Sequence, residues 1–385
     1  MERILPFTTE HNIFRESLGK FLEKEMVPNY EQWEQENLVP RSAWKKFGDQ
    51  GFLCMDVDEK YGGGGADYLY NAILVEEIGS RGLHGIYVRS HNDVVAPYIT
   101  ALGNEEQKMK WLPGCCSGDS ILAVAMTEPG AGSDLQAIRT TAKRDGDYYI
   151  VNGSKTFISS GLNCDLIILA VKTDTEIRPA HKGISILVVE ANETPGFERG
   201  RQIKKIGMHA QDTAELFFDN AKVPVANLLG EEGKGFIYLM QKLQQERLSS
   251  ALDALAKGER SLALTKQYVQ ERSVFGKTLN QYQNTQHVLA KCQVEVTLAR
   301  ALADQMILKH LNHENVQFET SILKYHCSEM CMRVADQCLQ LFGGYGYCEE
   351  YPISKMFVDS RINKIFAGAN EIMLNLIAKG MDMGL

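Results

Sequence analysis

The sequence contains no long hydrophobic run, no cluster of basic residues, no internal repeat and no low-complexity tract. No apolar segment approaches the roughly 20 residues that a transmembrane helix needs, so we expect no membrane insertion. The formal net charge is −8 and the basic residues are scattered, which argues against a nucleic-acid partner. The first residues, MERILPFTTEHN, carry neither a signal-peptide core nor a transit segment. We therefore expect a cytoplasmic bacterial protein, with a mature mitochondrial matrix protein as the alternative.

The nine cysteines lack the spacing of a disulfide framework, and their odd number is typical of a reducing compartment. Cys115 and Cys116 are adjacent, an arrangement that rarely forms a relaxed disulfide. Cys327 and Cys331 fall one helical turn apart beside His326, which fits a metal site as well as two buried thiols. Because free cysteine is commonly buried as a small hydrophobe, the sequence predicts no metal.

The distribution of apolar residues divides the 385-residue chain into three parts. Helical periodicity dominates residues 1–120, short apolar runs with turn signals occupy 121–230, and helical periodicity returns over 231–385. The sequence therefore predicts an α+β protein with an N-terminal helical domain, a middle β-barrel or sandwich, and a C-terminal helical bundle.

Individual helices and strands follow from the same periodicities. Helices are expected at 10–26, 42–50, 68–78, 94–102 and 105–112, then from Phe236 to Leu255 and at 258–272, 286–312, 318–341 and 370–379. Strands are expected at 121–126, 148–152, 156–159, 166–171, 183–189 and 215–219. Pro28 and Pro40 punctuate the first helices, and Asp145-Gly146 and Asn152-Gly153 are typical of hairpin turns.

The most informative stretch is ILAVAMTEPGAGSD, residues 121–134. Its apolar start is typical of a buried strand, and the proline and glycines that follow prevent a helix and leave backbone amides free. The hydroxyls of Thr127 and Ser133 can donate to heterocycle oxygens and to phosphate. The loop therefore suits a flat cofactor with an anionic tail, although a glycine-rich loop alone is also an ordinary turn between strands.

Four segments in this order closely resemble the acyl-CoA dehydrogenase family, across essentially the whole chain. They are TEPGAGSD at 127–134, KTFISS at 155–160, ERSVFGK at 271–277 and QLFGG at 340–344. The resemblance implies FAD as cofactor, an acyl-CoA substrate, an electron-transferring flavoprotein as acceptor, a role in fatty-acid β-oxidation, and a homotetramer built as a dimer of dimers.

The resemblance also implies where FAD is held. Phe157 stacks on the flavin and Ser159 hydrogen-bonds its reactive edge, while the segments at Arg272 and Gln340 reach the pyrophosphate and adenosine of a neighbouring subunit. The implied cofactor contacts are Met126, Thr127, Gly132, Ser133, Phe157, Ile158, Ser159, Arg272, Phe275, Gln283, Gln340, Leu341, Gly343, Gly344, Ala369, Asn370 and Glu371. Ala369 stands where relatives usually have Thr or Ser, which removes one hydroxyl near the cofactor.

The catalytic base is where this sequence departs from many relatives, whose base is a Glu in a motif like YEGT. The matching stretch, 365–370, reads IFAGAN and places Ala367 at that position. In the long-chain and isovaleryl-type branch the base lies on the first helix of the C-terminal domain, in a sequence that resembles ERL. Here 244–248 reads QQERL, which implies that Glu246 is the base. From the residues alone, the default interpretation of Glu246 is a solvated helix carboxylate paired with a neighbouring cation, and the combination of Ala367 with QQERL favours the catalytic role.

The family's reaction removes an α-proton and a β-hydride from an acyl thioester, so it needs a base, donors to the carbonyl oxygen and a flavin facing the β-carbon. The backbone amide of Ala367 and a ribityl hydroxyl are the implied donors, and Arg247 contacts the CoA part. The implied substrate contacts are Ser133, Leu243, Gln244, Arg247, Ala367 and Gly368.

The expected reaction is dehydrogenation of a medium-to-long or branched acyl-CoA to the trans-2-enoyl-CoA. Three alternatives stay open: a short branched, isovaleryl-type substrate, an oxygen-reactive acyl-CoA oxidase, and a catalytically inactive family member. Known two-domain oxidases are generally longer than 385 residues, and Ala367 is the feature that suggests an inactive site.

Overall fold

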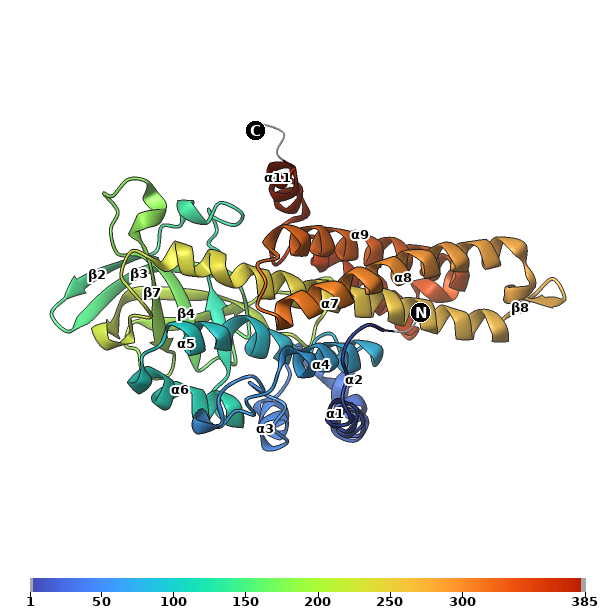
Figure 1. Ribbon diagram of the computed structural model, residues 1–385, viewed down its shortest axis with the longest axis horizontal. Helices are drawn as coiled ribbons and strands as arrows, with labels where there is room; N and C mark the ends of the chain where they lie inside the picture. Colours follow the sequence, from blue (N-terminus) through green and yellow to red (C-terminus); the bar gives the residue numbers. More distant parts are fainter. Residues whose placement is uncertain (1–2, 382–385) are drawn as a thin grey trace.

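The computed structural model describes residues 3–381. Its helices and strands follow one another as helical, β and helical parts, which confirms the predicted α+β class. In Figure 1 the N-terminal helices lie below, the sheet lies at one end, and the long C-terminal helices run from the sheet to the opposite end. The three parts meet where the long helices reach the sheet.

The N-terminal part consists of six α-helices with short π and 3-10 turns between them. The helices are α1 (Thr9–Phe21), α2 (Val27–Glu36), α3 (Arg41–Asp49), α4 (Tyr68–Ser80), α5 (Ala96–Leu102) and α6 (Glu105–Ser117). The expected break at Pro28 is wrong, because a π-helical turn joins α1 to α2. Pro28 lies in the first turn of α2, where its missing N–H leaves no helical hydrogen bond unmade.

The middle part is one curled sheet of seven strands. The strands are β1 (Leu122–Ala125), β2 (Thr141–Asp145), β3 (Tyr148–Ser159), β4 (Leu166–Lys172), β5 (Ile184–Glu190), β6 (Phe197–Gln202) and β7 (Thr213–Pro224). Their order is β1-β4-β2-β3-β7-β6, with β5 paired to β4. β1 runs parallel to β4, while β3 pairs antiparallel with both β2 and β7. This arrangement brings the ends of β1 and β3 to the same region.

The two predicted hairpin turns have different outcomes. Asp145 pairs with Tyr148, so the turn at Gly146 closes the β2–β3 hairpin as expected. The turn expected at Asn152-Gly153 is wrong, because β3 continues through these residues with a register shift. Gly153 has φ 147°, and a Cβ there would lie 2.5 Å from Oγ1 of Thr140, so the glycine serves close strand packing.

The C-terminal part is a helical bundle with a small hairpin at its far end. Its elements are α7 (Gly235–Glu271), β8 (Ser273–Val274), β9 (Lys277–Thr278), α8 (Gln283–Leu311), α9 (Gln317–Phe342), α10 (Pro352–Ser360) and α11 (Asn370–Gly380). The separate helix expected from Gly258 is wrong, because α7 is continuous over 37 residues. A Cβ on Gly258 would lie 2.8 Å from Sδ of Met330, so this glycine permits close contact between α7 and α9.

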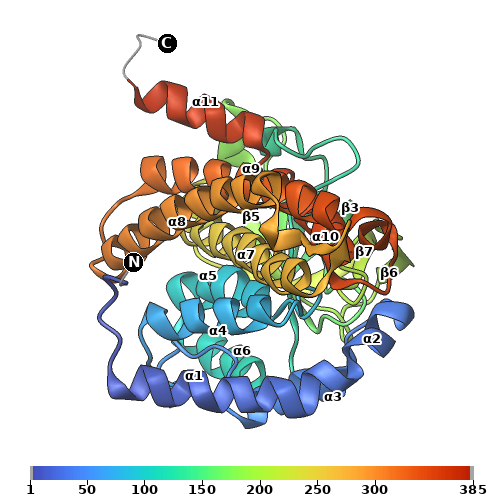
Figure 2. The same cartoon turned by 90° about the vertical axis from the view of Figure 1, so that its right-hand side faces the viewer.

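Helix α7 lies at the centre of the molecule, between α9 on one side and α4 on the other (Figure 2). One core cluster joins the three helices, with members such as Leu69 on α4, Leu252 on α7 and Met330 on α9. Residues 247–258 of α7 are all buried. Glu246 therefore lies directly before the segment of α7 that the core surrounds.

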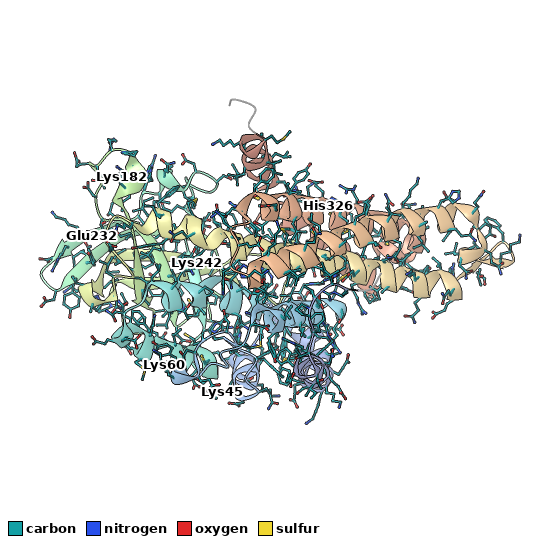
Figure 3. The ribbon with its side chains drawn as sticks, in the orientation of Figure 1. Lys45, Lys60, Lys182, Glu232, Lys242 and His326 are labelled. Atoms are coloured by element: carbon teal, nitrogen blue, oxygen red, sulfur yellow. The ribbon has the colours of Figure 1, made fainter. Side chains whose placement is uncertain are left out.

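Within residues 3–381, the nine cysteines are free and no group of three or more His, Cys, Asp or Glu side chains could hold a metal ion. In the same range, none of the helices is both long and apolar enough to cross a membrane. Charged side chains are distributed over different faces: Lys45 and Lys60 lie on the N-terminal part, and Lys182 lies beside the sheet (Figure 3).

Candidate active site

A cavity of about 130 Å³ lies where the three parts of the molecule meet. Its walls come from the segment before α5, from the ends of β1 and β3, from α7, and from the loop before α11. The lining residues are Tyr87, Arg89, Ser90, Val94, Val124, Met126, Thr127, Phe157, Ile158, Ser159, Glu246, Phe366 and Ala367. This cavity is thus lined by the predicted flavin loop and by the predicted stacking strand. It is also lined by Glu246 and Ala367, the two positions considered for the base.

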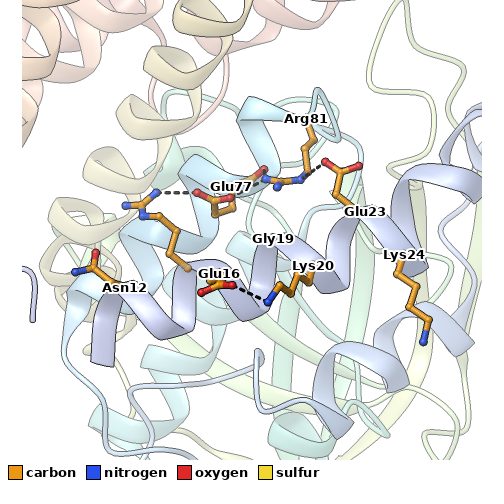
Figure 4. Close-up of a pocket in the computed structure, with 9 residues that line it drawn as sticks. Asn12, Glu16, Gly19, Lys20, Glu23, Lys24, Glu77 and Arg81 are labelled. Atoms are coloured by element: carbon orange, nitrogen blue, oxygen red, sulfur yellow. Dashed lines mark hydrogen bonds and ion pairs between the residues drawn. The ribbon is translucent and has the colours of Figure 1, made fainter. Parts of the chain in front are cut away.

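A second, more open hollow of about 650 Å³ lies over α1 and the end of α4. Its charged side chains form pairs with one another (Figure 4): Arg15 with Glu77 at 2.8 Å, and Arg81 with both Glu77 at 2.7 Å and Glu23 at 2.9 Å. Because these charges are already compensated, we assign no ligand to this hollow.

The loop after β1 is fixed by a buried ion pair between Glu128 and Lys155, with 2.8 Å between Oε1 and Nζ. Nζ of Lys155 also donates to the carbonyl of Met126 at 3.1 Å, and Glu128 accepts from the backbone N–H of Thr140 at 3.0 Å. Burial lowers the pKa of Lys155 to about 8. Burial alone would raise the pKa of Glu128, but Lys155 and its hydrogen bonds hold it below its usual range. The pair therefore ties the glycine-rich loop to β3.

Phe157 and Ser159 lie at the end of β3, where its pairing with β7 is interrupted. Phe157 has a left-handed φ of 59°, an unusual conformation for a bulky residue, and its side chain is 64% exposed. Oγ of Ser159 accepts a hydrogen bond from Gln211 Nε2 at 2.7 Å. An exposed aromatic ring beside a fixed hydroxyl fits one face and one edge of a flat heterocycle.

Gly132 and Ser133 continue this surface beyond the cavity. Both residues are exposed, and a Cβ on Gly132 would meet no atom within 4 Å. Together with the hydroxyl of Thr127, this open backbone fits the donor pattern that a flavin with an anionic tail requires. The residues present thus fit the cofactor predicted from the sequence.

Glu246 points into the cavity from α7. Its Oε2 is buried and has no hydrogen-bond partner among the described residues. Burial raises the pKa of Glu246, while the positive charges of Arg247, Arg89 and Lys324 act in the opposite direction. A partly desolvated carboxyl in a cavity, without a partner of its own, is the arrangement expected for a general base.

Ala367 lies in the wall of the same cavity and also has a left-handed backbone, with φ 53°. Gly368 follows at φ 89° and packs against Met373. Nζ of Lys324, on α9, donates to the carbonyl of Gly368 at 2.5 Å and to Oδ1 of Asn370 at 3.0 Å. The loop that carries Ala367 is therefore held in its strained conformation by a buried cation.

Several predicted substrate contacts lie outside the cavity lining: Ser133, Leu243, Gln244, Arg247 and Gly368. The amide of Gln244 is engaged with the segment before α9, where it contacts Glu314 and Val316. Arg247 is buried, with Nη1 3.5 Å from Oγ of Ser321. These side chains support the wall that carries Glu246.

The predicted contacts Ala369, Asn370 and Glu371 begin α11. The amide of Asn370 bonds to Lys324, to Ser328 at 2.9 Å and to Glu329 at 2.9 Å. Its side chain thus anchors the loop, and only its backbone is left for a cofactor.

The remaining predicted FAD contacts lie at the other end of the same chain, around β8 and β9 (Figure 1). They are Arg272, Phe275, Gln283, Gln340, Leu341, Gly343 and Gly344. The structure does bring two of their segments together: the guanidinium of Arg272 lies 5.4 Å from the ring of Tyr345. Within one chain, this surface and the cavity are separate.

Six lining residues were not predicted as site residues from the sequence: Tyr87, Arg89, Ser90, Val94, Val124 and Phe366. A signal for the first four exists in the stretch GIYVRSHNDVV, residues 85–95, where charged and polar residues interrupt an otherwise apolar segment. Such residues are seldom buried unless they have a partner or a role.

Comparison with known proteins agrees with this geometry. Family models for the N-terminal, middle and C-terminal domains of acyl-CoA dehydrogenase match residues 8–119, 123–221 and 233–381. The chain is 46% identical over 374 residues to the mitochondrial long-chain specific acyl-CoA dehydrogenase of Rattus norvegicus, covering 97% of this chain and 86% of the rat protein. It is 36% identical over 373 residues to an acyl-CoA dehydrogenase of Bacillus subtilis (strain 168), covering 97% and 98% of the two chains. The crystal structure of acyl-CoA dehydrogenase from Geobacillus kaustophilus matches with a TM-score of 0.97 and 52% identity, covering 99% and 100%.

Proposed function

The chain belongs to the acyl-CoA dehydrogenase family, and from this membership we propose that it converts a medium-to-long or branched acyl-CoA to the trans-2-enoyl-CoA, with Glu246 as the base. As a member of this family the protein is an FAD-dependent oxidoreductase. FAD, when bound, supplies the acceptor for the hydride that leaves the β-carbon. The side chains of the cavity have to bind the thioester, orient it and remove the α-proton.

The observation that carries the proposal is the isolation of Glu246. It is the one carboxylate among the described residues that line the cavity, and its Oε2 has no other partner. The α-proton of a thioester is weakly acidic, so a carboxyl whose pKa is raised by burial is better matched to it than a solvated one. Ala367, at the position of the usual base, cannot take a proton.

The backbone N–H of Ala367 is the proposed donor to the thioester carbonyl. Negative charge develops on that oxygen as the α-proton leaves, and fixed backbone donors stabilise such charge without reorganisation. The support for this role is the left-handed backbone of Ala367, which Lys324 holds through Gly368.

The proposed FAD site uses residues from two subunits. Thr127, Phe157 and Ser159 would hold the flavin ring, and the surface around Arg272 and Gln340 would hold the adenosine half of a neighbour's FAD. The separation of these two surfaces within one chain supports this arrangement and the proposed homotetramer. An electron-transferring flavoprotein is the proposed acceptor.

The test is anaerobic stopped-flow flavin reduction by octanoyl-, palmitoyl- and isovaleryl-CoA. Glu246→Gln should lower the rate by about 10³-fold, because proton abstraction by a positioned base contributes rate factors of that order. In Glu246→Gln, the further change Ala367→Glu should restore part of the rate, since both positions face the same cavity. FAD content and ligand binding, measured in each variant, serve as controls.

Each alternative predicts a different result. Reduction of Glu246→Gln at the parent rate would remove Glu246 from the role of base. Acyl-CoA binding without bleaching of the parent enzyme would indicate an inactive member. Rapid peroxide formation in air after reduction would indicate an oxidase, and preference for isovaleryl-CoA a short branched substrate.

A further inference from the structure

Arg89 is a buried cation in the wall of the proposed acyl cavity, and the reaction proposed above gives it no role. Only 5% of the residue is exposed, and its side chain lines the cavity together with Glu246 and Phe366. Its Nε is buried without a hydrogen-bond partner among the described residues. An unpaired guanidinium N–H is costly to bury, so its presence beside a ligand cavity requires a reason.

The surroundings hold the guanidinium group rigidly. Nη2 donates to the hydroxyl of Tyr87 at 2.6 Å, and the group lies 4.4 Å from the ring of Tyr87 and 5.3 Å from the ring of Phe366. Contact with the two aromatic rings and the bond to Tyr87 restrict the group, while its Nε remains without a partner among the described residues.

The nearest carboxylate, Asp253, forms only a long ion pair with Arg89 and is shared with other donors. Oδ2 of Asp253 is 4.0 Å from Nη2, and the same oxygen accepts hydrogen bonds from Lys257 and Asn363 at 2.9 Å each. Burial raises the pKa of Asp93, another acid near Arg89, to about 7, so that carboxyl carries little charge below neutral pH.

Among the described residues, Arg89 and Glu246 are the two charged residues of the lining, and Arg247 and Lys324, which lie outside it, add positive charge that acts on Glu246. An additional anionic group on the ligand would be compensated there, whereas a wholly apolar chain would leave the guanidinium edge desolvated.

From these observations we propose that Arg89 selects an acyl chain that ends in a carboxylate, so that the substrate is the CoA thioester of a dicarboxylic acid. A rigid guanidinium edge matches a carboxylate through paired N–H donors. This inference rests on the proposed function, since it names the substrate of the same site. Because Arg89 and Glu246 line one cavity of about 130 Å³, the carboxylate lies only a few bonds beyond the reacting carbons.

The test compares acyl-CoA pairs of equal carbon number in the parent holoenzyme: glutaryl with pentanoyl, adipyl with hexanoyl, and suberyl with octanoyl. At one length or more, the dicarboxylic thioester should give kcat/KM at least about tenfold higher than its plain partner, the range expected for a charge-assisted hydrogen bond. A further substrate, 6-hydroxyhexanoyl-CoA, ends in a hydroxyl group. Comparing it with adipyl-CoA distinguishes recognition of a carboxylate from recognition of any polar group at the end of the acyl chain. Non-oxidisable thioether analogues of the same pairs provide Kd ratios that need no turnover.

The variant Arg89→Met should reverse the preference, and Arg89→Lys should give an intermediate ratio, because it keeps the charge but loses the paired donors. Arg260→Met is the matched control: Arg260 also has an unpartnered Nε but lies outside the cavity lining, so its ratios should equal those of the parent.

Two results would overturn the inference: no length at which the parent favours the dicarboxylic thioester by about tenfold or more, or an unchanged ratio in Arg89→Met. Equal kcat/KM values for 6-hydroxyhexanoyl-CoA and adipyl-CoA would show that Arg89 does not recognise the carboxylate specifically. Failure of every thioester to bleach the flavin would instead defeat the proposed function, while the Kd ratios would still decide the role of Arg89.

Discussion

Glu246 and Arg89 share an uncommon property at the scale of single residues: each presents a buried polar atom to the same cavity without a protein partner. Most buried polar atoms are hydrogen-bonded, so two orphaned groups of opposite charge in one cavity mark a place built for a ligand. Their separation also matters, because a direct ion pair between them would lower the pKa of Glu246 and weaken it as a base.

The first prediction concerns the pH dependence of kcat/KM, which reports ionisation in the free enzyme. Glu246 acts only when deprotonated, and burial raises its pKa, so kcat/KM should fall with decreasing pH at a higher pH than an ordinary glutamate would give. Arg89 lowers the same pKa, so Arg89→Met should move this acidic limb to still higher pH.

The measurement is kcat/KM for octanoyl-CoA between pH 5 and 9. Arg260→Met is the control, and its acidic limb should lie at the same pH as that of the parent enzyme. A limb that stays fixed in Arg89→Met, or moves to lower pH, would contradict the coupling between the two side chains.

How far the site could be predicted depends on where each residue lies in the sequence. Thr127, Phe157 and Ser159 belong to short contiguous motifs, and the structure brings all three to the cavity. Arg89 and Phe366 are 277 positions apart and meet only through the packing of separate parts. No local pattern encodes that contact, so the charge of the cavity could not be predicted from the sequence.

At the scale of elements, α9 contributes a buried lysine that holds the loop carrying Ala367. Lys324 is the only described side chain whose hydrogen bond reaches the carbonyl of Gly368, and burial lowers its pKa to about 8. The helix thereby sets the conformation of a loop that precedes α11 in the chain. We treat Lys324 as a positioning residue, because it acts through the backbone of Ala367.

The second prediction is that Lys324→Met lowers kcat for octanoyl-CoA by about 10- to 100-fold, with a smaller change in KM. Loss of the bond from Lys324 leaves the carbonyl of Gly368 unsatisfied, at a cost of about 1–3 kcal/mol, whereas Oδ1 of Asn370 keeps its bond from Ser328, so the loop should relax and misplace the Ala367 amide. Ser328→Ala is the control, because it removes a donor to Asn370 and leaves the bond to Gly368 intact.

The readouts are kcat, KM and Tm for both variants. A fall in Tm with unchanged kcat would show that Lys324 stabilises the fold without positioning the donor.

Elements with strong periodicity could be predicted, but their junctions could not. Long amphipathic helices such as α8 and α9 were expected within a few residues of their observed bounds. The breaks expected at Pro28 and Gly258 rested on local propensity, and tertiary packing overrides it. Met330 shows the reason at Gly258, since close packing of α9 requires a residue without a side chain there.

At the scale of the whole molecule, partly buried ion pairs join the N-terminal part to the C-terminal bundle. Glu76 on α4 bonds to Arg300 on α8 at 2.6 Å, and Arg3 bonds to both Glu76 and Asp304. Burial alone would raise the pKa of Glu76, but these arginines keep it below its usual range. Because a charge left without its partner in a partly buried network is only partly solvated, this network resists separation of the parts whose junction forms the cavity.

At the far end of the bundle, by contrast, the apolar side chain of Phe275 is almost fully exposed to solvent. Phe275 is 98% exposed at the tip of the β8–β9 hairpin, where φ is 49° for Phe275 and 79° for Gly276. Tyr347, in the segment that Arg272 contacts through Tyr345, is 91% exposed. Aromatic and arginine side chains gathered in this way are typical of surfaces that bind a partner or a ligand.

The third prediction is that Phe275→Ser weakens FAD binding and subunit association together, because we propose that this tip contacts the FAD of a neighbouring subunit. Light scattering should give four copies of the 43.1 kDa chain for the parent, and a lower mass on dilution for the variant. The ratio of flavin to protein after gel filtration should fall in parallel. Met109→Ser changes an exposed apolar residue on α6; it is the matched control and should change neither quantity.

A Phe275→Ser variant that loses FAD but remains a tetramer would place the adenosine contact within one subunit. A variant that retains both FAD and the tetramer would exclude the tip of the hairpin from the cofactor site.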